Sequence, residues 1–258
     1  MNRLENRQRI IAGPCALESR EHAELTVDQA KKHGVQTIRM NLWKPRTRPG
    51  FEGVAKHGIP WVVAAAEQGI TPAMEVIMPE HVDLLMEEIL GKLPHATLLL
   101  WIGSRNQNHI IQRDIGKAVA GEPRVELMIK NQPWRDINHW GGIVSHVLHG
   151  GAAEEQLLLC HRGFAPWSKG LDEMRNIPDM EMALSLKRTL GIPLIMDPSH
   201  IGGQVELVKK LIQEFSIIPE IDGQIIEVHP DPTQAKTDAS QQLTWTELAE
   251  LLPNKGEK

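Results

Sequence analysis

The sequence is poor in residues that several common classes of protein need. Among 258 residues there are no tyrosines, three phenylalanines and two cysteines. So few aromatic rings leave little to stack on bases, and a net charge of -5 without a long basic tract also argues against nucleic acid as a partner. Cys15 and Cys160 could pair in principle, but intracellular thiols are mostly reduced, so we expect free thiols or metal ligands.

Long apolar runs are missing as well. No stretch approaches the roughly 18 apolar residues of a membrane-spanning helix. The first residues, MNRLENRQRIIAG, lack the apolar block of a signal peptide. We therefore expect no membrane partner and a cytoplasmic location. With 41% hydrophobic and 24% charged residues, the chain can bury a substantial core without disulfide support.

Short apolar runs, mostly β-branched, recur at fairly even spacing and predict the fold. Their near-continuous hydrophobicity suits parallel strands that are buried on both faces, and segments with a helical period lie between them. Repeated strand-helix units in about 250 residues predict an α/β fold, a (β/α)8 TIM barrel. The expected strands are residues 9–15, 37–43, 71–76, 97–103, 126–130, 156–163, 193–200 and 223–229, and the helical segments include 21–34, 79–90, 108–121 and 205–215.

A doubly wound open sheet is the rival architecture. No G-x-G-x-x-G follows the first expected strand, so we place the barrel ahead of it. The chain shows no linker and no low-complexity segment. We therefore expect a single domain over residues 1–258, with a core of about 9–252 and a frayed end at 253–258.

Each expected strand finishes on, or just before, a residue able to do chemistry. The carboxyl ends of barrel strands form the active-site face, so residues far apart in sequence should converge there. A single arginine at a strand end would be unremarkable because barrel rims are polar, but a complete set indicates a site. The residues are Cys15, Arg39 with Lys44 just beyond, Glu75, Arg105, Lys130, Arg162, His200 and Glu227.

Cations dominate this face, above all in residues 39–50, RMNLWKPRTRPG. Their mutual repulsion is tolerable only if anions lie between them. Guanidinium groups bind phosphate and carboxylate in a bidentate manner, so one phosphorylated acid or two phosphorylated substrates would fit. Alternatively, the cations pair with local acids in structural networks, where we expect Arg48 and Arg135. The converging cations are Arg39, Lys44, Arg46, Arg105, Lys130 and Arg162.

A second group offers one thiol, one imidazole and two carboxylates. This mixed set suits a borderline divalent ion such as Mn, Fe, Co or Zn. No pair has a local motif such as HExxH, and a lone buried cysteine is usually part of the core. Spacing alone therefore leaves both interpretations of Cys15 open, whereas Cys160, inside the sixth expected strand, is expected in the core. The candidate ligands are Cys15, His200, Glu227 and Asp238.

Seven segments resemble successive signatures of type I 3-deoxy-D-arabino-heptulosonate 7-phosphate (DAHP) synthases. They occur in the family's order and span nearly the whole chain. The likeness is to the type Iβ branch, and within it to the barrel that some bacteria fuse to a chorismate mutase. The segments are GPCALES (13–19), RMNLWKPRTRPGFEG (39–53), IGSRNQN (102–108), MIKN (128–131), CHRG (160–163), DPSHIGG (197–203) and EVHPDPTQAKTDASQQLT (227–244).

The resemblance implies metal-dependent condensation of phosphoenolpyruvate (PEP) with erythrose 4-phosphate, the first step of the shikimate pathway to chorismate and the aromatic amino acids. It implies the metal ligands Cys15, His200, Glu227 and Asp238. It implies a PEP site of Arg39, Lys44, Ser104, Arg105, Lys130 and Arg162. It implies an erythrose 4-phosphate site of Lys44, Pro45, Arg46, Thr47 and Asp238, and the catalytic residues Lys44, His200 and Cys15, with Lys44 and His200 as proton carriers.

Some features depart from the family pattern or go beyond the barrel. RMNLW stands where relatives often have R-G-G-x-F, and Ser104 where they often have alanine, which could alter affinity for PEP. We expect no regulatory domain before Ile10 and no chorismate mutase after Glu250, so a mutase would act in trans or belong to a part that has been removed. A homo-oligomer, dimer or tetramer, is expected from the resemblance alone.

Three other functions stay open. The related 3-deoxy-D-manno-octulosonate 8-phosphate synthase joins PEP to arabinose 5-phosphate, although KPRT argues against it. A Schiff-base aldolase would use Lys130. A non-catalytic phosphometabolite-binding partner of chorismate mutase would not need the full set of metal ligands and cations found here.

Overall fold

The computed structural model describes residues 8–45, 49–166 and 174–252. Within these ranges parallel strands pair in chain order and close into a barrel, because β1 lies beside both β2 and β8. The predicted (β/α)8 barrel is thereby confirmed. The strands are β1 (Arg9–Gly13), β2 (Thr37–Arg39), β3 (Thr71–Val76), β4 (Leu98–Ile102), β5 (Val125–Lys130), β6 (Leu157–His161), β7 (Leu194–Met196) and β8 (Gly223–Glu227).

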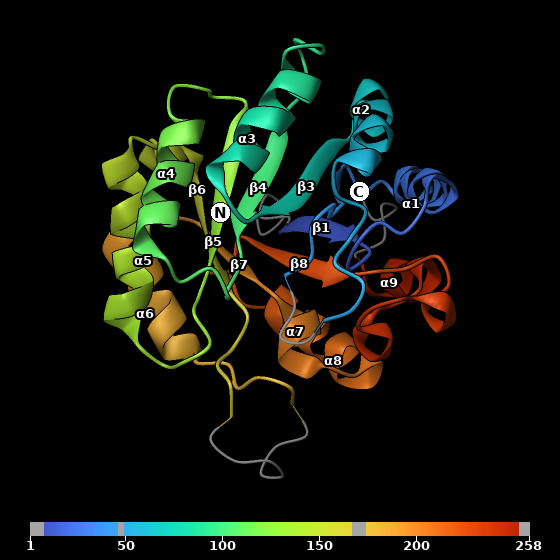
Figure 1. Ribbon diagram of the computed structural model, residues 1–258. Coiled ribbons are helices and arrows are strands. Elements are labelled where there is room, and N and C mark those ends of the chain that lie inside the picture. Colours follow the sequence, from blue (N-terminus) through green and yellow to red (C-terminus); the bar gives the residue numbers. More distant parts are fainter. Residues whose placement is uncertain (1–7, 46–48, 167–173, 253–258) are drawn as a thin grey trace, which may run out of the picture.

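Helices surround the strands on the outside of the barrel (Figure 1). The four helical segments expected from the sequence are present as α1, α3 continued by η2, α4 and α8. Among the described residues, no helix is long and apolar enough to cross a membrane. The helices are α1 (Arg20–Lys32), α2 (Ile59–Glu67), α3 (Pro79–Leu85), α4 (His109–Val119), α5 (Ile137–Gly150), α6 (Met180–Leu190), α7 (Pro198–Gly202), α8 (Val205–Ser216) and α9 (Trp245–Leu251), with short segments η1 (Ala55–Gly58), η2 (Met86–Leu90), η3 (Glu154–Gln156), η4 (Pro232–Gln234) and η5 (Ala239–Gln241).

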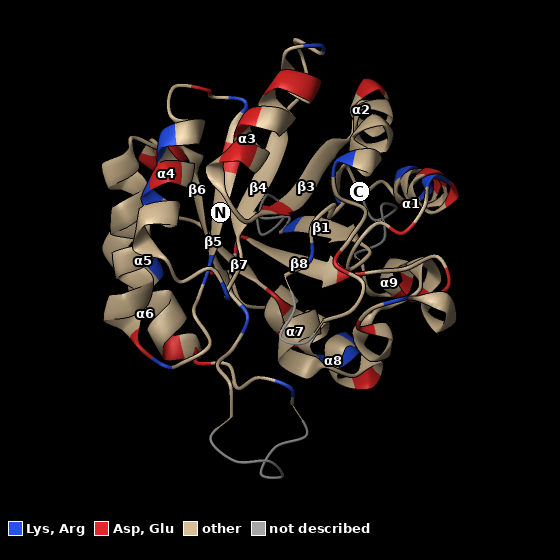
Figure 2. Ribbon diagram, in the orientation of Figure 1, with Lys and Arg blue, Asp and Glu red and all other residues tan. Residues whose placement is uncertain are grey.

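Two apolar layers explain why the strands are almost continuously hydrophobic. Alternate side chains of a strand point to opposite faces, so one set fills the barrel and the other packs beneath the helices. Figure 2 shows red and blue bands on the outer helices, notably α1, α3 and α4, whereas the strands are mostly tan. Cys160 lies inside the barrel, as predicted. The interior layer consists of Ile11, Ala73, Leu99, Trp101, Met128, Leu158, Cys160, Ile195 and Ile225.

Two strands end about four residues before the ends of the runs that predicted them, the largest differences among the strand ends. The runs expected to end at residues 43 and 200 stop as strands at Arg39 and just before Asp197. Asp197 begins α7 instead, since its carboxylate accepts the backbone N–H of His200 at 3.1 Å. Pro198 favours this start, because it has no N–H for a strand ladder and suits the first helical turn. His200 therefore lies on a short helix above the barrel mouth.

Gly13 permits the close approach of β1 and β2 at their carboxyl ends. Its φ is +152°, and a Cβ at this position would lie 2.5 Å from the carbonyl oxygen of Arg39. No other residue fits there without moving the backbone. The contact keeps Cys15, two residues further on, beside the end of β2.

Helices α4 and α5 also approach at the level of their backbones. A Cβ on Gly116 of α4 would lie 2.2 Å from the carbonyl oxygen of Val147 in α5. At Gly142, in the middle of α5, no heavy atom of the described residues, apart from its chain neighbours and the helix's own backbone, lies within 4 Å of the corresponding position. A substitution at Gly116 therefore tests the close packing of the two helices, whereas one at Gly142 tests helix propensity alone.

We expect Gly116→Ala to lower the free energy of unfolding by about 1–3 kcal/mol, because the added methyl overpacks the helix contact. Gly142→Ala should leave it unchanged or raise it by up to about 1 kcal/mol, since alanine favours helix. Urea unfolding followed by circular dichroism measures both changes. Equal effects of the two substitutions would contradict the close packing.

Candidate active site

A pocket lies among the carboxyl ends of the strands, at the mouth of the barrel. It brings together the strand-end residues that the sequence predicted to converge. The lining residues are Cys15, Arg39, Asn41, Lys44, Pro45, Glu75, Trp101, Gly103, Ser104, Arg105, Lys130, Arg162, His200 and Glu227. Their convergence is thus confirmed, while the ligands assigned to them stay predictions.

The thiol of Cys15 lies beside two carboxylates. One donor atom each of Cys15, Glu227 and Asp238 lies within 4.8 Å of the other two. The Cys15 sulfur is 3.2 Å from Asp238 Oδ2. Lys44 Nζ donates a hydrogen bond to the same sulfur and another, of 2.7 Å, to Asp238 Oδ2. The loops after β1 and β8 and the end of β8 thus supply one compact group of donor atoms.

Cys15 is fixed through its backbone. The side-chain amide of Asn41 donates to its carbonyl oxygen at 2.7 Å, and its own N–H donates to Gln242 Oε1 at 3.0 Å. Burial raises the pKa of the thiol to about 12, and the Glu227 carboxylate adds to the shift. The thiolate therefore needs a further positive charge to form near neutral pH, which a bound cation would provide.

His200 is oriented by Asp197. Its Nδ1 donates to the Asp197 carboxylate at 2.9 Å, which leaves the lone pair of Nε2 free, and Nε2 lies 3.8 Å from Glu227 Oε1. Burial lowers the pKa of His200 to about 4, so the imidazole is neutral near pH 7. A carboxylate that fixes the second ring nitrogen in this way is typical of histidines that bind metals.

The four candidate ligands fit a divalent transition metal in their chemistry. They offer sulfur, nitrogen and oxygen donors, and a mixed set of this kind suits ions such as Mn, Fe, Co or Zn. The donor atoms of Cys15, Glu227 and Asp238 lie close together, and His200 Nε2 is 3.8 Å from one of them, Glu227 Oε1. We therefore identify Cys15, His200, Glu227 and Asp238 as residues that could hold such an ion.

The other half of the pocket is cationic, and part of it is neutralised by buried acids. Arg39 Nη2 lies 2.8 Å from Glu227 Oε1, with the two side chains 2% and 0% exposed. Lys130 Nζ lies 2.7 Å from Asp197 Oδ2, and these side chains are 5% and 0% exposed. Two carboxylates thus connect the cations to the candidate metal ligands.

Part of the cationic half has no acidic hydrogen-bond partner among the described residues. Within the described part of the chain, the guanidinium of Arg162 donates to a neutral group, Ser104 Oγ, at 3.0 Å, and burial lowers the pKa of Arg162. Arg39 Nη1 is buried without a hydrogen-bond partner among the described residues. The side chains of Arg39 and Lys130 lie over Trp101, 5.4 and 5.2 Å from the ring centre. The pocket is therefore suited to an anion with more than one negative group.

The remaining predicted residues have three different outcomes. Pro45 lies at the rim, where its carbonyl oxygen accepts a hydrogen bond of 3.5 Å from Arg105. Arg46, Thr47 and Arg48 lie outside the described residues. Arg135, expected in a structural network, pairs with Asp179 at 2.5 Å.

Sequence reasoning missed the residues that hold the candidate ligands in place. Asp197 contacts both Lys130 and His200. The Gln241 side-chain amide donates to Glu227 Oε2 at 2.7 Å, and Arg175 donates to both Asp238 Oδ1 and Gln241 Oε1. Asp197 could have been found, because an Asp-Pro pair at a strand end commonly starts a helix. The two other residues carry no local signal.

Comparison with known proteins gives one consistent family. The DAHP synthetase I family profile matches residues 4–257. A phospho-2-dehydro-3-deoxyheptonate aldolase of Thermotoga maritima is 30% identical over 244 residues, which cover 94% of this chain and 67% of that protein. A 2-dehydro-3-deoxyphosphooctonate aldolase of Rhizobium meliloti is 26% identical over 275 residues, which cover 96% of this chain and 88% of that protein.

Two solved structures share the fold. The crystal structure of phospho-2-dehydro-3-deoxyheptonate aldolase (DAHP synthase) from Thermotoga maritima has a TM-score of 0.82 at 27% identity, covering 96% of this chain and 68% of that one. A truncated form of 3-deoxy-D-arabino-heptulosonate 7-phosphate synthase from Thermotoga maritima gives 0.77 at 25% identity, covering 96% and 85%.

The buried pair of Arg39 and Glu227 generates a prediction about stability. In the presence of a chelator, Arg39→Met should lower the free energy of unfolding by about 3–5 kcal/mol, because it leaves a buried carboxylate without its partner. Arg9→Met is the matched control, since Arg9 pairs with Glu126 at 2.7 Å while 31% exposed, and about 0–1 kcal/mol is expected. Chemical denaturation measures the free energy of unfolding of both variants. Similar decreases in the two variants would contradict the assignment of Arg39 and Glu227 as a buried ion pair.

Proposed function

The chain belongs to the DAHP synthetase I family, and we propose that it condenses PEP with D-erythrose 4-phosphate and water to give DAHP and phosphate. One observation carries the proposal. A single pocket joins a cationic cage for a phosphorylated acid to a group of thiol, imidazole and carboxylate donors for a divalent metal. An aldol-type joining of two phosphorylated substrates would use both halves, the cations to neutralise charge and the metal to polarise a carbonyl.

PEP is assigned to the cationic half. Its phosphate and carboxylate carry more than one negative charge, which suits Arg162 with its neutral partner and Arg39 with its unpartnered Nη1. Bidentate guanidinium contacts would orient the planar acid, and neutralising it lowers the cost of bringing two phosphorylated substrates together. The proposed PEP residues are Arg39, Lys44, Ser104, Arg105, Lys130 and Arg162.

Erythrose 4-phosphate is assigned to the rim next to Lys44. Pro45 leads from Lys44 toward Arg46 and Thr47, and Arg46 would bind the aldose phosphate. Asp238 lies 2.7 Å from Lys44 Nζ, on the side of the candidate metal ligands. The aldehyde would therefore lie between the donor group and the PEP cage.

A divalent ion held by Cys15, His200, Glu227 and Asp238 would supply Lewis-acid polarisation of the aldehyde oxygen. C3 of PEP then attacks the aldehyde carbon, water captures the positive charge at C2, and the resulting phosphohemiketal loses phosphate by C–O cleavage. Burial would lower the pKa of Lys44, but a thiolate at Cys15 together with the carboxylates of Glu227 and Asp238 would outweigh it and raise that pKa. Lys44 is therefore protonated and can donate to the new alkoxide.

His200 is the second proton carrier in the proposal. Its neutral ring and free Nε2 suit it to bind a metal or to accept a proton from water, whereas Asp197 keeps the opposite side of the ring in place. Lys130, by contrast, forms a buried ion pair with Asp197, in which its Nζ lies 2.7 Å from Asp197 Oδ2. That pairing disfavours the Schiff-base alternative, which needs a free amine.

The proposed second substrate, erythrose 4-phosphate, has one competitor. Relatives at 26% identity include 2-dehydro-3-deoxyphosphooctonate aldolases, so arabinose 5-phosphate is the alternative aldose. KPRT at 44–47 supports erythrose 4-phosphate. Homo-oligomer formation and any association with a chorismate mutase stay predictions from the resemblance. A cytoplasmic location and a single catalytic barrel domain stay predictions from the sequence.

The first test is the reaction itself. Protein incubated with PEP, Mn²⁺ and erythrose 4-phosphate should consume PEP and release phosphate, and a chelator should abolish both until the metal is restored. The loss of PEP absorbance and a phosphate assay measure this. Turnover with arabinose 5-phosphate only would favour the alternative aldose, and binding of PEP without any turnover would favour the non-catalytic function.

The second test compares the two cysteines. Cys15→Ala should reduce metal-dependent turnover by at least about a hundredfold, because it removes a metal ligand and a contact of Lys44. Cys160→Ala is the control, since that thiol lies inside the barrel and should be needed only for packing. Steady-state rates and circular dichroism of both variants decide, and a fully active Cys15→Ala protein would remove Cys15 from the site.

A further inference from the structure

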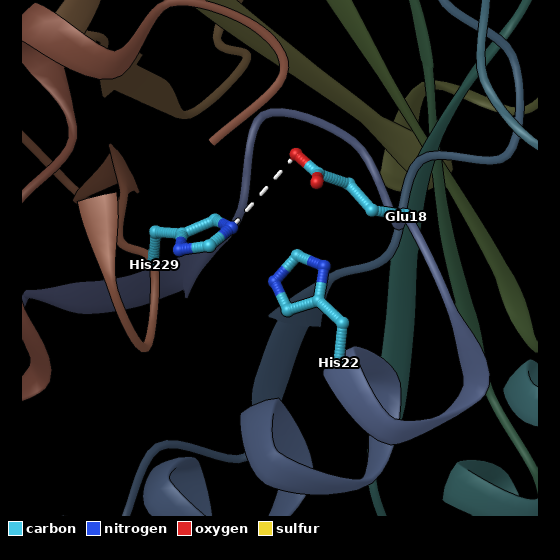
Figure 3. A group of neighbouring side chains, drawn as sticks. All are labelled: Glu18, His22 and His229. Atoms are coloured by element: carbon cyan, nitrogen blue, oxygen red, sulfur yellow. Dashed lines mark ion pairs between the residues drawn. The ribbon is translucent and has the colours of Figure 1, made fainter. Parts of the chain in front are cut away.

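A second group of metal-type donors lies beside the active site, where no step of the proposed reaction uses it. Glu18 lies in the loop after β1, His22 in the first turn of α1 and His229 in the loop after β8. One donor atom of each lies within 4.8 Å of the other two. Figure 3 shows the three side chains pointing toward one another from these separate segments.

The imidazoles in this group are buried with unused nitrogens. His22 is 9% exposed, and neither of its ring nitrogens has a hydrogen-bond partner among the described residues. His229 is 5% exposed, and its Nε2 is also unpartnered in that part of the chain, since Glu18 Oε1 is 3.8 Å away. Buried polar atoms are nearly always paired, so these nitrogens indicate a bound group between them.

The chemistry of the group identifies that bound species as a cation. The carboxylate of Glu18 would repel an anion, and the two imidazoles add neutral nitrogen donors. A pair of histidines with one glutamate is a ligand set that zinc uses with an open fourth position. The backbone N–H of Lys236 donates to Glu18 Oε1 at 2.8 Å and so orients the carboxylate.

We propose that Glu18, His22 and His229 form a second divalent-cation site, of the zinc class, separate from Cys15, His200, Glu227 and Asp238. The ion would tie the loop that carries Cys15 to the loop that follows Glu227. It would thereby stiffen the two segments that supply the candidate catalytic ligands. The proposal does not depend on which aldose the protein uses.

Binding requires a change at His229. The backbone N–H of Asp231 donates to His229 Nδ1 at 3.0 Å, so the neutral ring carries its hydrogen on Nε2. A cation at Nε2 needs the other tautomer, in which this hydrogen moves to Nδ1 and the bond from Asp231 is lost. Asp231 is exposed, so water can accept its N–H instead. The tautomer of His229 is therefore a specific marker of the bound site.

Metal counting separates the two sites. Protein loaded with Zn²⁺ and dialysed should hold two ions per chain by mass spectrometry, and Glu18→Gln or His22→Ala should each leave one. With Co²⁺ the thiolate charge-transfer band reports Cys15 alone, so it should persist in both variants. His95→Ala is the control for nonspecific binding of zinc to exposed histidines, because the chain has 12 histidines and His95 is exposed.

The outcomes that overturn the proposal are equally specific. The second site is excluded if the wild-type protein holds one zinc ion and its Co²⁺-loaded form shows the thiolate band. It is also excluded if the His22→Ala protein holds as many ions as the wild type. If the His95→Ala protein loses as much zinc as the His22→Ala protein, the additional zinc is bound nonspecifically and the second site is also excluded. If His22→Ala does not fold, Cys15→Ala decides, because it must retain one ion and show the His229 Nδ1–H tautomer by nitrogen NMR.

Discussion

Closure of the barrel is the constraint on which the site depends. β1 and β8 pair in parallel from Arg9 opposite Gly223 to Gly13 opposite Glu227, so the first and last strands end side by side. Cys15 therefore meets Asp238 although 223 residues separate them along the chain. Parallel pairing around the whole barrel also brings every carboxyl end to one mouth. Without this closure the site would lose both its group of donor atoms and its cationic cage.

Within that mouth, two buried carboxylates connect the two halves of the pocket. Glu227 pairs with Arg39 and faces His200, and Asp197 pairs with Lys130 and holds His200. Each acid is fully buried, so its charge is compensated by direct partners and not by water. The positions of the cations and of the candidate metal ligands are therefore coupled, because a shift of either carboxylate would move its partners in both halves of the pocket.

The elements that the sequence predicted well are those with a strong local signal. The continuous apolar runs gave the strands, and residues such as Cys15 and Lys130 at their ends gave the pocket lining. The predicted strand end at residue 200 was wrong, because Asp197 caps a helix directly after Met196 and the polar residues that follow belong to that helix. Gln241 was missed because a glutamine has no local pattern that shows which buried carboxylate it will orient.

The sequence by itself determined the fold class, the family and the kinds of chemical group available, since periodicity and motifs are local properties of the chain. Only the tertiary structure decided which charged groups form ion pairs, such as Arg39 with Glu227. It also decided which metal-ligand atoms lie close together, such as those of Glu18, His22 and His229. These pairings depend on distances of a few ångströms between separate strand ends. Barrel closure sets those distances, and spacing along the chain does not encode them.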